Sequence, residues 1–272
     1  MLGAVLGDII GSTYEWYNVK TENFDLFPKG SRFTDDTVLS VAIADKILNS
    51  QNSNIRNRHA YAMWLKQYYK RYPNAGFGQM FSSWAVSESL QIQRSFGNGA
   101  AMRISPIGFA FQEIKEIKRE VNASCFYTHH NLEAKKGAQA IAISIFLARK
   151  QAGKEEIKKY IEKNFRYNLC SLDDIREGYV FDSRTSYCVP PAIEAFLEST
   201  SYEDAIRKAI SIGGDSDTIA CMTGGIAQAY YKYIPKEIYD KGIYFLDIDL
   251  RRVIKNFNEK YEIECIPPVF YE

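Results

Sequence analysis

Two segments of the sequence combine paired carboxylates with threonine. The first, Thr34-Asp35-Asp36-Thr37, and the second, Asp215-Ser216-Asp217-Thr218, are each followed by an apolar stretch with helical spacing. Each segment therefore predicts the N-terminus of a helix, where Thr and Asp side chains cap free backbone N–H groups. A cap needs a single acceptor, however, and two neighbouring carboxylates repel each other unless a cation lies between them.

Oxygen ligands without accompanying His or Cys suit hard cations such as Mg²⁺ and Mn²⁺. If the fold brings the two acidic segments together, they could hold two such ions about 3.5–4 Å apart. Helix capping explains either segment taken alone. The residues by themselves therefore leave capping and a two-metal centre both open.

Three further segments carry less specific signals. Small residues over Gly7–Gly11 allow close packing of an N-terminal helix, and Glu15 follows as either a surface residue or a site residue. The glycine-rich turn Gly97–Arg103 precedes a helix and could offer backbone N–H groups to a phosphate, although it matches neither a Walker loop nor a dinucleotide-binding motif. The segment Thr128–His130 is typical of an ordinary loop or cap.

The composition limits the classes of protein that fit. The chain has 272 residues, 46% hydrophobic and 25% charged, as in a globular protein with a sizeable core. A formal net charge of +1 gives no electrostatic reason for wholesale binding to nucleic acid or to a membrane surface. The N-terminus lacks the cationic region of a signal peptide, and the longest apolar stretch, near Ala140–Ala148, is too short to span a bilayer.

The cysteine pattern bears on the compartment and on the type of metal site. The chain has five cysteines, scattered and without a C-x-x-C pair, and only three histidines. An odd, scattered set favours a reducing compartment over a disulfide framework and argues against a thiolate metal site. We therefore expect a cytoplasmic protein that binds any metal through oxygen.

Apolar residues recur mainly at helical spacing, which predicts an all-α fold of about a dozen helices. No Gly/Ser-rich or Pro-rich linker divides the chain, so residues 1–272 are expected to form one compact domain. Strand-like alternation is limited to Tyr179–Asp182 and Ile263–Tyr271. The clearest helical stretches are residues 38–48, 60–68, 137–148, 192–197, 219–230 and 243–257, and 137–148 is apolar almost all round, as in a helix buried on every side.

Together and in this order, the segments resemble the motifs of the ADP-ribosylglycohydrolase family from Gly3 to about Tyr231. The two acidic segments in combination are the specific part of this resemblance. It implies an all-α fold with a binuclear Mg²⁺ or Mn²⁺ centre. The positions that match the family's metal ligands are Thr34, Asp35, Asp36, Asp215, Asp217 and Thr218.

The resemblance also implies roles for residues around the metals. Glu15 matches a glutamate that acts in catalysis or gates the site. Many bacterial relatives have the sequence Thr-His-Asn-His-Pro-Glu at the positions of Thr128–Glu133. This chain lacks the second His and the Pro of that motif, so an altered cleft rim is expected. The positions that match the ADP-ribose cleft are Gly97, Asn98, Gly99, Met102 and His129.

We therefore expect a metal-dependent hydrolase that releases ADP-ribose from a modified acceptor by cleaving the glycosidic bond at the distal ribose. ADP-ribosylated arginine on a protein is the favoured substrate, a modified nucleobase stays open, and a monomer is expected. Two metals would hold the ribose hydroxyls and orient a water, which Glu15, Asp35 or Asp36 could polarise. A two-metal nucleotide phosphohydrolase and a non-catalytic ADP-ribose-binding descendant are the alternatives.

Overall fold

The computed structural model describes residues 1–49 and 57–265. In these residues the fold is built from α-helices, with no strand beyond isolated β-bridges, so the all-α prediction is confirmed, with fourteen α-helices against the expected dozen. The helices are α1 (Leu2–Gly11), α2 (Asp35–Asn49), α3 (Asn57–Arg71), α4 (Gln79–Val86), α5 (Ser105–Ala110), α6 (Ile114–Cys125), α7 (Leu132–Arg149), α8 (Lys154–Phe165), α9 (Leu172–Arg176), α10 (Thr185–Glu198), α11 (Tyr202–Ser211), α12 (Ser216–Tyr231), α13 (Lys236–Ile243) and α14 (Ile248–Lys260).

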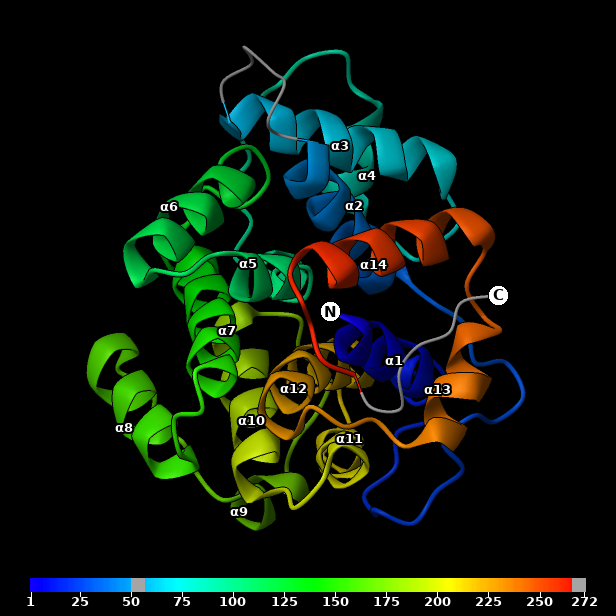
Figure 1. Ribbon diagram of the computed structural model, residues 1–272, viewed down its shortest axis with the longest axis vertical. Coiled ribbons are helices and arrows are strands. Elements are labelled where there is room, and N and C mark those ends of the chain that lie inside the picture. Colours follow the sequence, from blue (N-terminus) through cyan, green and yellow to red (C-terminus); the bar gives the residue numbers. More distant parts are fainter. Residues whose placement is uncertain (50–56, 266–272) are drawn as a thin grey trace.

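Helix α12 lies at the centre of the fold. All of its residues from Ser216 to Ala229 are buried, and α1, α7, α10 and α11 pack around it (Figure 1). A helix enclosed in this way needs small or apolar residues on every face. The predicted burial of residues 137–148 is also confirmed, because only Gln139 and Leu147 of that stretch of α7 are not buried.

Helices α2 and α12 carry the two acidic segments. α2 begins at Asp35, and α12 begins at Ser216 with Asp215 as its N-cap residue, so both predicted helix N-termini are confirmed. α2 packs against α3, α5 and α14, and it also contacts α1 and α12. Helices α1, α2 and α12 therefore contact one another, and the two predicted helix N-termini belong to this group of three.

Three glycines of α1 face α12 at four-residue spacing, and they let the two backbones touch. A Cβ atom on Gly7 would lie 2.2 Å from the Ala220 carbonyl oxygen, and one on Gly11 would lie 2.5 Å from Asp217 Cα. Gly3 meets Gly224 in the same way, with 2.5 Å to its carbonyl oxygen. This contact places the C-terminal half of α1 directly against the start of α12.

The strand predicted at Tyr179–Asp182 is wrong. The segment lies in the loop between α9 and α10 and has no regular structure. Tyr179 is buried and stacked on Tyr187, whereas Val180 and Phe181 are both exposed, so no alternation of faces exists. A strand needs an extended partner, and in the described part of the chain the β-bridge of this loop lies at Arg184, opposite Gly97, and not within residues 179–182.

The helical stretch predicted at 243–257 is interrupted in the structure, because residues 244–247 connect the end of α13 to α14, which begins at Ile248. α13 ends at Ile243, and a new N-cap forms at Asp247, whose side chain accepts a hydrogen bond of 2.9 Å from the Leu250 backbone N–H. A local side-chain cap thus outweighs the continuous apolar periodicity. Of the predicted strand Ile263–Tyr271, residues 263–265 have no regular structure and the remainder lies outside the described residues.

The hydropathy of the helices bears on the expectation that the chain has no membrane-spanning segment. None of the helices in residues 1–49 and 57–265 combines the length and the apolar character needed to cross a lipid bilayer.

The contact between α1 and α12 predicts a strong effect of adding one methyl group. We expect Gly7→Ala to lower the free energy of unfolding by about 1–3 kcal/mol, because overpacking two backbones outweighs the better helix propensity of Ala. Urea denaturation measures this change. Gly178→Ala is the control, since a Cβ atom there meets nothing within 4 Å, and it should change the free energy by less than about 0.5 kcal/mol. Equal effects of the two substitutions would contradict the close contact.

Candidate functional site

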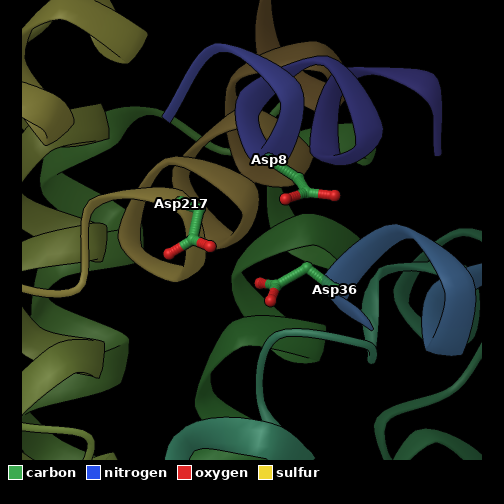
Figure 2. A group of neighbouring side chains, drawn as sticks. All are labelled: Asp8, Asp36 and Asp217. Atoms are coloured by element: carbon green, nitrogen blue, oxygen red, sulfur yellow. The ribbon is translucent and has the colours of Figure 1, made fainter. Parts of the chain in front are cut away.

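Six acidic side chains lie in or beside one site at the start of α12. They come from helices α1, α2 and α12, from the N-cap position of α12 and from the turn after α1. Asp8 of α1, Asp36 of α2 and Asp217 of α12 point toward one another, and each offers a carboxylate oxygen within 4.8 Å of the others (Figure 2). A second trio of Glu15, Asp215 and Asp217 meets the same criterion. Because Asp217 belongs to both trios, the two groups are adjacent and form one continuous acidic centre. The sixth residue, Asp35, lines the cavity next to the centre but belongs to neither trio.

Burial makes this concentration of negative charge unfavourable. Asp36 is 2% exposed and Asp217 is 5% exposed, and within the described residues neither has a Lys or Arg nitrogen within 4.0 Å. Burial, followed by repulsion from neighbouring carboxylates, raises the pKa of both groups well above the usual range. A bound cation would remove this penalty by favouring the ionised forms.

The pKa values of two partly exposed carboxyls, Glu15 of the centre and Asp35 beside it, are shifted in the same direction. Burial raises the pKa of Glu15 to about 7, and repulsion from Asp215 adds to the shift. Burial raises the pKa of Asp35 to about 8, and repulsion from Asp8 adds to it. At neutral pH, therefore, the metal-free centre retains protons that ordinary carboxyls would have lost.

The donor set fits Mg²⁺ or Mn²⁺. Asp36 Oδ1 is a buried acceptor without a hydrogen-bond partner in the described residues, as expected of an oxygen reserved for a cation. The hydroxyl oxygens of Thr34 and Thr218 lie 3.4 and 3.3 Å from Asp36 Oδ2. Carboxylate and hydroxyl oxygens grouped in this way suit hard divalent cations.

Asp8 was not among the predicted site residues, yet its carboxylate organises the site. Its carboxylate accepts hydrogen bonds from Thr34 N (2.9 Å), Thr34 Oγ1 (2.6 Å), Thr37 N (3.1 Å) and Thr37 Oγ1. Asp8 thus caps α2 from a different helix. The available signal was a lone acidic residue inside the apolar run of α1, which is fully buried.

This cap resolves the alternative interpretation of the acidic segments. The N-terminus of α2 is capped by Asp8, so Asp36 is not needed for that purpose. Asp215, the N-cap residue of α12, forms no side-chain capping hydrogen bond. Helix capping therefore does not account for Asp36 or Asp215.

All twelve residues predicted for the site line one cavity of about 430 Å³. Gly99 and His129 face each other there, because a Cβ atom on Gly99 would lie 3.3 Å from His129 Nε2. Burial, followed by the nearby Arg103 cation, lowers the pKa of His129 well below its usual value, so His129 is neutral. The twelve residues are Glu15, Thr34, Asp35, Asp36, Gly97, Asn98, Gly99, Met102, His129, Asp215, Asp217 and Thr218.

The cavity therefore joins an acidic centre to a glycine-rich wall. Its loop begins with a short 3₁₀ turn, Asn98–Ala100, and a buried Arg103 side chain donates to Thr128 Oγ1 at 2.8 Å, which ties the loop to the His129 segment. The chain departs from the bacterial motif at His130, Asn131 and Leu132, and none of the three lines the cavity, so the expected change in the cleft rim does not fall among the lining residues.

Comparison with known proteins identifies the family of the chain. The sequence profile of the family described as ADP-ribosylglycohydrolase matches residues 1–263. The chain belongs to the ADP-ribosylglycohydrolase family. This membership confirms the resemblance seen in the motifs and agrees with the all-α architecture.

Individual relatives of this ADP-ribosylglycohydrolase family member are distant in sequence. The chain is 27% identical to ADP-ribosylhydrolase ARH3 of Xenopus tropicalis, with 85% of each chain covered. It is 26% identical to ADP-ribosylarginine hydrolase Tri1 of Pseudomonas putida (strain GB-1), covering 85% of this chain and 69% of the relative. A solved structure, an ADP-ribosylglycohydrolase-related protein complex, shares the fold with a TM-score of 0.69 and 21% identity over 97% of this chain and 95% of that one.

The raised pKa values predict how pH affects the metal-free protein. Glu15 and Asp35 have ordinary values of 4.5 and 3.8 and folded values of about 7 and about 8, so the folded state binds more protons between these limits. Stability should therefore fall as pH rises from about 5 to 8. Thermal unfolding in EDTA measures this fall, and saturating Mg²⁺ should reduce it.

The matched control is the double variant Glu15→Gln/Asp35→Asn, which lacks both titrating carboxyls. In EDTA its Tm should exceed that of the parent by an amount that grows from pH 5 to pH 8. A constant difference between the two proteins over this range would contradict the raised pKa values.

Proposed function

We propose that the protein is a hydrolase that uses two Mg²⁺ or Mn²⁺ ions to remove ADP-ribose from ADP-ribosylated protein. Its membership of the ADP-ribosylglycohydrolase family supports the release of ADP-ribose. The observation that carries the metal dependence is the pair of acidic trios that share Asp217, together with the buried Asp36 Oδ1, which has no hydrogen-bond partner among the described residues.

The residues that would hold the metals come from the two helix N-termini. When bound, the ions would neutralise the carboxylates and supply Lewis acidity toward the ribose hydroxyls and a water molecule. The protein contributes the fixed placement of its ligands, since Asp8 orients the Thr34 hydroxyl by accepting a hydrogen bond of 2.6 Å from it. The proposed ligands are Thr34, Asp35, Asp36, Asp215, Asp217 and Thr218.

Glu15 is the proposed general base. It lies in the turn that follows α1, half-buried at the cavity wall, and belongs to the trio with Asp215 and Asp217. A carboxylate at this place can accept a proton from a water that attacks the distal ribose C1, while the surrounding negative charge stabilises an oxocarbenium-like transition state. Asp35 and Asp36 are proposed as metal ligands and not as the base, since both lie at the N-terminus of α2 with the other proposed ligand Thr34.

The glycine-rich wall beside the acidic centre would contact the rest of ADP-ribose. Backbone N–H groups of a glycine-rich loop suit a pyrophosphate, and Gly97, Gly99 and Met102 lie on this wall of the cavity. The Gly99 N–H is the proposed donor, because the Gly97 N–H donates to Ser95 Oγ and the Met102 N–H donates to the Asn98 carbonyl oxygen. Neutral His129 can form hydrogen bonds with the ligand without adding charge.

Arginine is the proposed acceptor residue. The relative from Pseudomonas putida is named an ADP-ribosylarginine hydrolase, which supports this choice, whereas the relatives named ARH3 carry no acceptor in their names. The free cysteines support a cytoplasmic location, and we propose that the protein acts as a monomer.

The deciding experiment offers arginine-linked, serine-linked and nucleobase-linked ADP-ribose side by side, with Mg²⁺, Mn²⁺ or EDTA. We expect free ADP-ribose from the arginine conjugate, loss of turnover in EDTA and recovery with either metal. Full activity in a demonstrably metal-free sample would overturn the metal dependence. Release of phosphate in place of ADP-ribose would identify a phosphohydrolase, and binding without turnover would identify a non-catalytic descendant.

The assignment of Glu15 predicts a specific kinetic defect. Glu15→Gln keeps the shape of the side chain and removes its charge, so we expect kcat to fall at least about 100-fold at saturating metal while ADP-ribose still binds. Glu88→Gln serves as the control, since Glu88 is exposed and lies outside the cavity, and it should leave kcat unchanged. A kcat of Glu15→Gln within a few-fold of the parent would place Glu15 outside the mechanism.

A further inference from the structure

The Asp215 carboxylate is held by a side chain from a distant part of the sequence. Asn98 Nδ2 donates a hydrogen bond of 2.7 Å to Asp215 Oδ2. Both residues are only 6% exposed. Among the described residues, Asn98 is the sole hydrogen-bond donor to this carboxylate.

The local backbone leaves Asp215 in need of such a partner. Gly213 and Gly214 precede it with φ values of +75° and +74°, and the Asn18 side chain accepts a hydrogen bond from the Gly214 N–H. These contacts fix the backbone of the turn. They leave the Asp215 side chain free, because Asp215 makes no capping hydrogen bond to its own helix.

The surroundings of Asn98 determine which end of its amide faces Asp215. The Cys188 thiol donates to the Asp182 carbonyl oxygen at 2.8 Å, so its sulfur is available as an acceptor, and Asn98 Nδ2 lies 3.3 Å from it. An ionised carboxylate also only accepts hydrogen bonds. With acceptors on both sides, the NH₂ group must point toward Cys188 and Asp215, and the reversed amide would place oxygen against oxygen.

The same loop holds other residues of the cavity wall, but their contacts differ. Asn98 is the member of this wall whose side chain reaches an acidic residue of the centre by a hydrogen bond, whereas Gly97 and Gly99 present backbone only. The bond joins two walls of the cavity that are 117 residues apart in the sequence. Partners of metal ligands in such positions fix ligand orientation and tune metal affinity.

We propose that Asn98 is a positioning residue of the metal centre, which fixes the Asp215 side chain for metal binding, and that its amide nitrogen is not a contact for ADP-ribose. This inference rests on the proposed function in one respect, namely that Asp215 is a metal ligand. It assigns to Asn98 a role different from that of its neighbours in the loop.

The test measures Mn²⁺ binding directly, by the EPR signal of free Mn²⁺, in folded protein without substrate. We expect Asn98→Ala to weaken Mn²⁺ affinity by about 10–100-fold, as is usual for the loss of a ligand's hydrogen-bond partner. At saturating Mn²⁺ its Kd for ADP-ribose should stay within about threefold of the parent value. Asn98→Ser is the second variant if Asn98→Ala does not fold.

Ser95→Ala is the matched control. Ser95 lines the same cavity and accepts a hydrogen bond of 3.1 Å from the Gly97 N–H, so its loss perturbs the loop without touching Asp215. It should leave Mn²⁺ affinity unchanged. Unaltered Mn²⁺ affinity in Asn98→Ala, or an equal loss in Ser95→Ala, would overturn the proposal. A parent that binds Mn²⁺ but releases no ADP-ribose would refute the proposed function and leave this inference standing.

Discussion

Helices α1 and α12 touch backbone to backbone because Gly3, Gly7 and Gly11 carry no side chain. This contact decides where the acidic residues lie. It brings Asp8 beside Asp217, and Asp8 in turn holds the first residues of α2, so that Asp36 meets the same point. Wider spacing of the two helices would separate the carboxylates and leave no shared centre.

The acidic site lowers the free energy of unfolding of the metal-free protein. Buried carboxyls without counter-cations are unfavourable, and here burial and mutual repulsion raise the pKa of Asp36 and Asp217 well above the usual range. The extensive apolar core around α7 and α12 offsets this effect. Such an arrangement is typical of sites in which binding or catalysis requires groups that the fold alone would not favour.

The class of fold and the two acidic segments of the candidate site could be predicted from local patterns in the sequence, whereas Glu15 and the cleft residues were implied by the family resemblance. Helical periodicity marked α7 and α12, and the paired carboxylates marked the N-termini of α2 and α12. What could not be predicted depends on contacts between distant residues. The cap that Asp8 places on α2 spans 26 residues, and the bond from Asn98 to Asp215 spans 117. The false strand at 179–182 arose because alternation of side chains says nothing about whether a partner strand exists.

The Asp8 cap has a consequence for how this protein can change over time. One carboxylate serves Thr34 and Thr37 together, through both backbone and side-chain donors. A substitution at any one of the three residues changes how a substitution at the other two affects stability, so the effects are not additive. Asp8, Thr34 and Thr37 are therefore expected to change together during evolution, although of the three only Thr34 lines the cavity.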